Sequence, residues 1–243
     1  MSILKDFLDI VYPPRCHICQ KFLSGDKSDS PCFCKDCLDD FYEISGPICT
    51  ICGVPFESLS EEDHICEACL RRRPYYDKLR APYAYEGVIM DAVHQLTYKR
   101  KTQLARSLGS LLGSFAEKKG YDLHDFLIMP VPLHPKKLRV RRFNQSLLLA
   151  RSMSIGEKTD IDYLSLKRLK NTTPQTVLSS RDRRKNVRNA FNIIEGRSFE
   201  KKNVLLVDDV ATTGSTMNEC ARVLKKAGCE SVLCLALART ITV

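Results

Sequence analysis

Hydrophobic residues recur along this chain in two spacings, which predict a series of strands and helices. Short apolar segments predict strands at residues 126–131, 163–168, 204–207 and 231–238, and an alternating pattern predicts another strand at residues 79–85. Apolar residues three and four positions apart predict amphipathic helices at residues 88–98, 104–115 and 215–227, and a further helix is expected to begin at Asn144 and Gln145. Another apolar helical face, at residues 3–11, is expected to pack on the protein.

The junction between the fourth predicted strand and its helix, residues 204–216, has the sequence VLLVDDVATTGST. Four apolar residues lead into Asp208 and Asp209, and small hydroxylated residues then close on Gly214. A turn from strand to helix offers free backbone N–H groups and the positive end of a helix, which together bind phosphate. Two carboxylates would repel a phosphate, so they need ribose hydroxyls or a bound Mg²⁺ as partners. The stretch therefore predicts a site for a sugar 5-phosphate.

A simpler interpretation of this junction is an ordinary strand-to-helix turn with an N-cap. Other phosphate motifs do not apply, because the chain has neither GxxxxGK[ST] nor a GxGxxG sequence after a strand. A sugar 5-phosphate accounts for the two acids and the hydroxyl-rich turn together, so we favour it over the simpler interpretation.

Eight of the twelve cysteines form four CxxC pairs near the start of the chain. The pairs are Cys16/Cys19, Cys34/Cys37, Cys49/Cys52 and Cys66/Cys69. The third pair repeats the first and the fourth repeats the second at nearly the same offset, which indicates an internal duplication. Two residues between cysteines let a tight turn present both thiolates to one ion, and two such turns complete a tetrahedral site. Pairing in sequence order predicts two structural Zn²⁺ sites of four cysteines each.

Several alternatives for the cysteines stay open. They are an interleaved pairing of the four turns, iron–sulfur ligation, disulfides, and substitution of His17 or His64 as a ligand; Cys32 is left over. Zinc ribbons often contact nucleic acid, but there is no Lys or Arg between Lys35 and Asp63. A folding or interaction module is therefore favoured over a DNA reader.

Composition and the start of the chain narrow the class of protein. Hydrophobic residues make up 44% and charged residues 28%, as in a soluble globular protein. No apolar run approaches the roughly 20 residues that span a bilayer, and we recognise no signal peptide, so we expect no membrane span and a cytoplasmic location. Cysteines in such a chain favour metal over disulfides. The run Arg71-Arg72-Arg73-Pro74 predicts a boundary between domains 1–76 and 77–243.

The net charge of +9 is concentrated in two segments, which argues for local anion sites. Residues 136–151 hold six basic residues and no acid, and they follow the proline-rich loop PVPLHP. Dense guanidinium groups beside a rigid loop suit pyrophosphate, whereas the alternative is a solvated helix start. The second segment, residues 167–188, holds eight basic residues and one acid. It overlaps the stretch NTTPQTVLSSRDRRKNVRNAF, residues 171–191, which we expect to be a mobile lid. Read alone, both segments could instead form a nucleic-acid surface.

Together these motifs resemble one family. The four CxxC pairs, PVPLHP, RRFNQS, the lid stretch and VDDVATTGST cover nearly the whole chain and closely resemble the ComF family (competence protein ComF/ComFC and GntX-like proteins). The resemblance implies an α/β protein with a type I phosphoribosyltransferase fold, in which helices flank a parallel sheet with a hood, preceded by a small double zinc ribbon. The chain departs from the family pattern at Arg142, where the pattern has Gly.

The resemblance also implies a ligand, phosphoribosyl pyrophosphate (PRPP) with Mg²⁺, and displacement of its pyrophosphate by a nitrogen nucleophile. Positive charge would develop on the ribose and negative charge on the leaving group, so the site must stabilise pyrophosphate and hold the ribose still. Asp208 and Asp209 would contact the ribose hydroxyls, directly or through Mg²⁺. The 5-phosphate would bind along Val210, Ala211, Thr212, Thr213, Gly214, Ser215 and Thr216. Candidates for pyrophosphate are Arg139, Arg141, Arg181, Arg184 and Lys185.

The acceptor is not identified by these motifs. Purine-salvage relatives carry an Asp in the phosphate loop that faces the base, whereas this chain has Thr212, so a 6-oxopurine acceptor is not supported. A rival hypothesis is a non-catalytic protein that senses PRPP or binds single-stranded DNA. Such a protein would serve the DNA-uptake machinery, with a DNA-uptake helicase or other competence proteins as partners.

Overall fold

The computed structural model describes residues 13–23, 30, 32–56, 62–153, 159–171 and 187–241. The apolar face predicted at residues 3–11 and most of the predicted lid lie outside these described residues. Of the helices among the described residues, none combines the length and the apolar character needed to cross a membrane.

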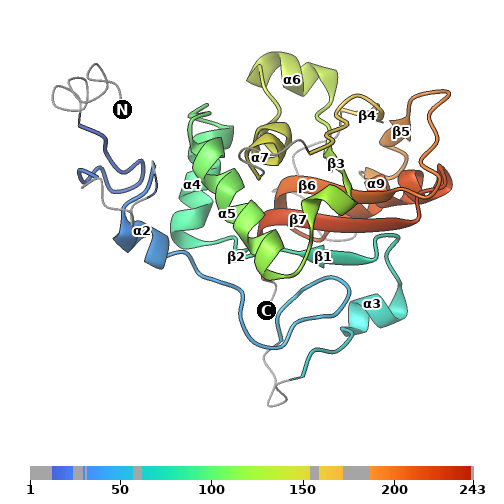
Figure 1. The fold of residues 1–243 in the computed structure, drawn as a ribbon, viewed down its shortest axis with the longest axis horizontal. Helices are drawn as coiled ribbons and strands as arrows, with labels where there is room; N and C mark the ends of the chain where they lie inside the picture. Colours follow the sequence, from blue (N-terminus) through green and yellow to red (C-terminus); the bar gives the residue numbers. More distant parts are fainter. Residues whose placement is uncertain are drawn as a thin grey trace.

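A parallel sheet forms the centre of the molecule (Figure 1). Its path runs through β1 (Lys78–Arg80), β7 (Ser231–Arg239), β6 (Asn203–Ala211) and β3 (Leu127–Pro130), and β2 (Tyr83–Ala84) also pairs with β7. In the register of the central strands, Leu206 lies between Met129 and Cys234. This arrangement confirms the predicted α/β fold with a parallel sheet.

Both faces of the sheet are buried, because alternate residues of β6 belong to different hydrophobic clusters. Leu205 and Val207 pack with the helices α4 (Gly87–Thr97), α5 (Leu104–Lys118) and α7 (Gln145–Met153). Val204 and Leu206 pack with α9 (Ser215–Lys226) on the other face. A strand that is covered on both faces is apolar throughout rather than alternating, which explains the run of four apolar residues before the acid pair.

Two of the predicted strands differ from the observed ones. The strand predicted at residues 79–85 is divided into β1 and β2 around Pro82, because proline has no N–H group to donate to a neighbouring strand. The strand predicted at residues 163–168 is limited to β4 (Leu166–Arg168), which pairs antiparallel with β5 (Phe191–Ile193) in a separate sheet.

Helices α5 and α7 pack unusually close together where α5 carries Gly109 and Gly113. A Cβ atom at Gly109 would lie 2.7 Å from the carbonyl oxygen of Leu149, and one at Gly113 would meet the carbonyl oxygen of Met153. The two glycines are four residues apart, so they lie on the same face of the helix. Glycine therefore permits a contact between backbones that a larger residue would prevent.

The cysteine-rich region has two parts that contact different faces of the sheet domain. The first part includes α2 (Lys35–Asp39), and its Cys16, Cys34 and Cys37 pack near Val88 of α4. The second part includes α3 (Glu67–Arg71), and its Cys49 and Cys69 belong to the hydrophobic cluster of α9. A short 3₁₀ helix, η1 (Leu123–Asp125), connects α5 to β3. The domain boundary near residue 76 stays a prediction.

Candidate functional site

The acid pair lies within β6 rather than after it. The strand was expected to end at Val207, but β6 continues to Ala211 because β7 extends beside it and pairs Ala211 with Arg239. The neighbour on the other side, β3, has its last pair at Val207. Asp208 and Asp209 therefore lie where the sheet loses a neighbouring strand, at the carboxyl ends of its strands. Ligands of open parallel sheets bind at such positions.

Asp208 is a buried carboxylate, with 9% of its residue surface exposed. Its Oδ1 accepts hydrogen bonds from Ser146 Oγ at 2.8 Å and from the backbone N–H of Asp209 at 3.0 Å. Burial and the charge of Asp209 raise the pKa of Asp208 well above its usual value, although the hydrogen bond from Ser146 opposes the shift. A bound cation or hydroxyl donors would stabilise this charge, so the residue is suited to a ligand that carries either.

Asp209 is held by groups from a different helix. Its Oδ2 accepts a hydrogen bond from Thr97 Oγ1 of α4 at 3.3 Å, and its Oδ1 accepts from the backbone N–H of Val210 at 2.9 Å. Tyr85 lies near Asp209. Its burial, and to a lesser extent the charges of Asp209 and Tyr98, raise the pKa of Tyr85 to about 12. The acid pair is thus clamped between α7, which supplies Ser146, and α4, which supplies Thr97.

The turn after β6 has the backbone conformation that its glycine permits. Gly214 has a φ of 69° and directly precedes α9, which begins at Ser215. A Cβ atom at Gly214 would lie 3.1 Å from the hydroxyl of Tyr76 and 3.3 Å from Leu79 Cδ1. Beside the turn, the hydroxyls of Thr213 and Ser215 are 2.7 Å apart. The positive end of a twelve-residue helix and a set of hydroxyls therefore meet at this turn, as a phosphate site requires.

The basic residues after PVPLHP lie on a short helix, α6 (Pro135–Arg141), rather than in a loop. Pro135 occupies the first turn, and His134 Nδ1 accepts a hydrogen bond from the backbone N–H of Lys136 at 3.1 Å. The helix ends at Arg142, whose φ of 70° lies in the left-handed region. The glycine of the family pattern would adopt this conformation at least cost, which explains why that pattern has Gly here.

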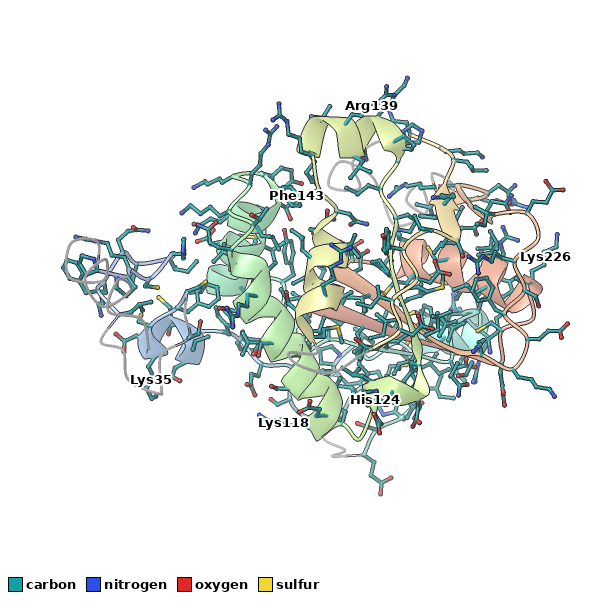
Figure 2. All side chains as sticks on the ribbon, turned by 45° about the horizontal axis from the view of Figure 1, so that its top comes forward. Lys35, Lys118, His124, Arg139, Phe143 and Lys226 are labelled. Carbon is teal, nitrogen blue, oxygen red and sulfur yellow. The ribbon has the colours of Figure 1, made fainter. Side chains whose placement is uncertain are left out.

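The two arginines predicted to bind pyrophosphate have different surroundings. Arg141 donates a hydrogen bond to Gln145 Oε1 at 2.6 Å, and its guanidinium carbon lies 5.7 Å from the centre of the Tyr98 ring. Gln145 directly precedes Ser146, which donates to Asp208. Arg141 is therefore linked to the acid pair through the start of α7. Arg139 is exposed on α6, at the outer surface of the molecule (Figure 2). The other predicted residues, Arg181, Arg184 and Lys185, lie outside the described residues.

A basic cluster near the acid pair was not identified from the sequence. Burial lowers the pKa of Lys137, and the charges of Arg168 and Arg141 lower it further. Burial also lowers the pKa of Arg168, whereas the charge of Asp208 opposes this shift. These interactions place cations from α6 and β4 in the same region as Asp208. Part of this cluster was recognisable, because Lys137 and Arg141 are four residues apart on one helix.

Two four-cysteine groups confirm the pairing predicted in sequence order. In each group, Cys16/Cys19/Cys34/Cys37 and Cys49/Cys52/Cys66/Cys69, the ligand atoms all lie within 4.8 Å of one another. The sulfurs of Cys19 and Cys34 are 3.6 Å apart, and those of Cys52 and Cys66 are 3.7 Å apart. Tetrahedral zinc with Zn–S bonds of about 2.3 Å requires sulfur separations of about 3.8 Å. Both groups therefore fit structural zinc, with four protein ligands at each site.

Backbone donors around Cys49 support a thiolate there. The N–H groups of Cys52 and Cys66 each donate to its sulfur at 3.4 Å. Burial opposes ionisation, but these hydrogen bonds outweigh it and lower the pKa of Cys49 to about 6. Among the described residues, the two groups contain cysteines alone. His64 instead stacks on Phe56 with ring centres 3.8 Å apart.

Comparisons with known proteins agree with both halves of the chain. A double zinc ribbon domain model matches residues 7–70, and a phosphoribosyl transferase domain model matches residues 151–241. Competence protein F of Haemophilus influenzae is 33% identical over 202 residues, which cover 80% of this chain and 86% of that protein. DNA utilization protein YhgH of Escherichia coli O157:H7 is also 33% identical over 202 residues, with coverage of 80% and 85%.

Competence protein ComFC of Bacillus subtilis is more distant, at 25% identity over 198 residues that cover 80% of this chain and 78% of that protein. The identity and coverage of the Haemophilus relative are sufficient to show a common family. The two domain matches, the parallel sheet and the two cysteine groups agree with it. The chain therefore belongs to the ComF family, in which a double zinc ribbon precedes a phosphoribosyltransferase domain.

Proposed function

We propose that this protein binds PRPP with Mg²⁺ and transfers phosphoribose to a nitrogen nucleophile, with release of pyrophosphate. The observation that carries the proposal is the arrangement at the end of β6. A clamped pair of carboxylates, Asp208 and Asp209, is followed within one turn by Gly214 and the start of α9. The carboxylates suit ribose hydroxyls, and the turn suits the 5-phosphate.

The donor set also fits Mg²⁺ bound together with PRPP. Carboxylate oxygens and substrate phosphates are the ligands that Mg²⁺ prefers in proteins, and a bound cation would oppose the rise in the pKa of Asp208 that burial and Asp209 cause. Asp208 and Asp209 would hold the ion, directly or through the ribose. When bound, the ion would neutralise charge on the pyrophosphate group.

Different residues of the chain would bind the 5-phosphate, the ribose and the pyrophosphate. Backbone N–H groups and hydroxyls from Ala211 to Thr216 would hold the 5-phosphate and so orient the ribose. The carboxylates would lie near the ribose, where positive charge develops. Arg141, with Lys137 and Arg168 beside it, would stabilise the charge on the leaving pyrophosphate. Arg139, Arg181, Arg184 and Lys185 remain further candidates for that role.

The names of the relatives support a role in DNA uptake or use, and our proposal places this role in the cytoplasm. Competence protein F and DNA utilization protein YhgH are named for such roles. A second candidate function, binding of single-stranded DNA without catalysis, is favoured by the exposed cations of α6 and its end, Lys136, Arg139 and Arg142. In that case PRPP would be a regulatory ligand rather than a substrate.

Calorimetric titration with PRPP and Mg²⁺ tests the binding step. The double variant Asp208→Asn/Asp209→Asn should bind PRPP about 10–100-fold more weakly, because each hydrogen bond to a charged group contributes about 1.5–3 kcal/mol. Asp91→Asn, an exposed change on α4, is the matched control and should bind like the wild type. Equal affinity in all three proteins would contradict the assignment of the acid pair.

Release of pyrophosphate across a panel of nucleobases and amines tests the chemical step. Release with one acceptor class would support the transferase and identify its substrate. Tight PRPP binding without release for any acceptor would overturn the enzyme proposal in favour of a sensor. Affinity for single-stranded DNA that persists at physiological salt would support the second candidate, whereas affinity lost at that salt would reflect counterion release alone.

A further inference from the structure

The second cysteine group lies against the proposed phosphate turn, and three sets of contacts join them. The first set runs through Leu79 and Tyr76, which pack directly against Gly214. The backbone N–H of Leu79 donates to the carbonyl oxygen of Ile51 at 2.7 Å, and Ile51 lies between the ligands Cys49 and Cys52. Tyr76, Leu79 and Ile51 are all buried in the same hydrophobic cluster. Leu79 therefore contacts the metal-binding turn through its backbone N–H and Gly214 through its side chain.

The second set of contacts uses two buried arginines. Arg80 donates to the carbonyl oxygens of Thr50 at 2.8 Å and Ile51 at 3.3 Å. Arg239 donates to the carbonyl oxygen of Cys52. Arg239 also pairs in the sheet with Ala211, the last residue of β6 before the turn. Both guanidinium groups therefore need the Cys49–Cys52 turn to keep its shape, since its carbonyl oxygens are their acceptors.

The third set of contacts reaches α9. The backbone N–H of Tyr75 donates to Asn218 Oδ1 at 2.7 Å, and the backbone N–H of Asn218 donates to the carbonyl oxygen of Gly214 at 2.8 Å. Tyr75 follows α3, which carries the ligand Cys69. The first turn of α9 is thus held by the segment that leaves the second cysteine group.

Among the residues that the structure describes, the first cysteine group has no comparable connection. Its segment contacts α4 and α5 instead, through Val88 and through a hydrogen bond of 3.2 Å from Ser30 Oγ to Ser107 Oγ. Among the described residues, no hydrogen bond joins residues 13–41 to residues 208–218. The duplicated sequence therefore supplies two similar metal sites with different surroundings.

We propose that metal at the second cysteine group positions the phosphate turn through Tyr76, so that metal occupancy and PRPP binding are coupled. Zinc would hold the Cys49–Cys52 turn, and Tyr76 and Leu79 share a hydrophobic cluster with its Cys49. Tyr76 and Leu79 pack against Gly214, and Arg239 joins the carbonyl oxygen of Cys52 to Ala211. Tyr76 acts as a positioning residue and does not touch the ligand. The identity of the ligand rests on the proposed function, whereas the mechanical link does not. The coupling is reciprocal, so PRPP must also retain the second zinc.

Amide hydrogen exchange of the ligand-free protein tests the link without any ligand. Tyr76→Leu removes the ring under Gly214, and exchange at residues 211–218 should become about tenfold faster or more, because local opening there becomes easier. Phe41→Leu removes a buried ring packed against Phe33 and Tyr83 beside the first group, and should leave residues 211–218 unchanged. Tyr76→Phe keeps the ring and should restore slow exchange. Equal exchange at residues 211–218 in the Tyr76→Leu and Phe41→Leu proteins would overturn the inference.

Competition for zinc with a chelator at equilibrium tests the coupling itself. In Cys37→Ser, which keeps only the second site, PRPP should raise the zinc affinity by about 5–150-fold, the usual range of coupling between two sites. In Cys69→Ser, which keeps only the first site, PRPP should have no effect. Equal effects at both sites, or no effect in a protein that binds PRPP, would overturn the coupling. Failure of the wild type to bind PRPP would overturn the proposed function, while the exchange experiment would still decide the role of Tyr76.

Discussion

Two aspartates of this protein lie in opposite electrostatic surroundings. Burial and Asp209 raise the pKa of Asp208 well above its usual value. Burial would also raise the pKa of Asp162, but hydrogen bonds from Ser165 and Leu164 outweigh it and lower the pKa. The backbone N–H groups of Leu164 and Ser165 each donate to Asp162 Oδ1 at 2.9 Å. The charge on the first carboxylate is destabilised in the folded state, whereas the second carboxylate stabilises its own turn.

The contrast predicts opposite pH dependences. A raised pKa means that the folded state binds more protons than the unfolded state, so Asp208 lowers stability as the pH rises from about 4 through its folded pKa. Asp208→Asn should therefore be about 1–2 kcal/mol more stable than the wild type at pH 7, as expected where function costs stability. The gain should shrink as the pH falls to about 4, as urea unfolding across this range would show.

Asp162→Asn is the matched control, with the opposite sign. A lowered pKa supplies stability at neutral pH that is lost as the pH falls through the folded pKa. This variant should be less stable than the wild type at pH 7, and the difference should shrink in acid. A loss of stability at pH 7 in both variants would contradict the assignment of Asp208 as a destabilised charge.

Among helices and strands, the predictions were most successful where the spacing of apolar residues along the element determines which face is buried. The predicted apolar face of α4 is buried at Ile89, Ala92, Val93 and Leu96. The close approach of α5 and α7 was not predicted, because Gly109 and Gly113 reveal it only when the partner helix is known. Without this contact, glycine at position 109 would be unfavourable, because glycine destabilises a helix interior by about 1 kcal/mol relative to alanine.

Substitution of Gly109 tests this helix contact. Gly109→Ala should destabilise the protein by about 1–3 kcal/mol in urea unfolding, because the added Cβ forces the backbones of α5 and α7 apart and outweighs the gain in helix propensity. Ser114→Ala, on the exposed face of the same helix, should be neutral or slightly stabilising. If Gly109→Ala is as stable as Ser114→Ala, then α5 and α7 do not pack this closely in solution.

The molecule as a whole joins a duplicated metal-binding region to a sheet domain through two unlike contacts. The first cysteine group packs beside α4, and the second lies in the cluster that includes α9. Because each group supplies four ligands within reach of one ion, the two sites should be filled independently.

Metal analysis tests this arrangement. The purified protein should contain about two zinc ions per chain, since the geometry provides two closed tetrahedral sites. Cys32→Ser should also retain about two, because Cys32 lies outside both groups and its sulfur instead donates to the carbonyl oxygen of Gln103. One zinc per chain in the wild type would contradict pairing in sequence order.

Features that depend on neighbours along the chain were accessible from the sequence by itself. The CxxC spacing predicts that the two sulfurs of each pair share an ion, because two intervening residues let a tight turn present both thiolates to it. The apolar run before Asp208 predicts a buried strand, and the hydroxylated residues up to Gly214 predict a turn into the next helix. The family resemblance rests on the same local motifs, and the two domain matches and the relative at 33% identity confirm it.

Only the tertiary structure determined what surrounds those motifs. The length of β6 depends on β7 as its partner, and the surroundings of Asp208 depend on Ser146 from a distant helix. The contact of Tyr76 with Gly214 likewise joins residues more than a hundred positions apart. Such contacts follow from which strand lies beside which and how helices cover the sheet. The spacing of residues along the chain does not predict these contacts. Burial of apolar surface favours many compact arrangements, and the detailed packing of side chains makes one of them the most stable.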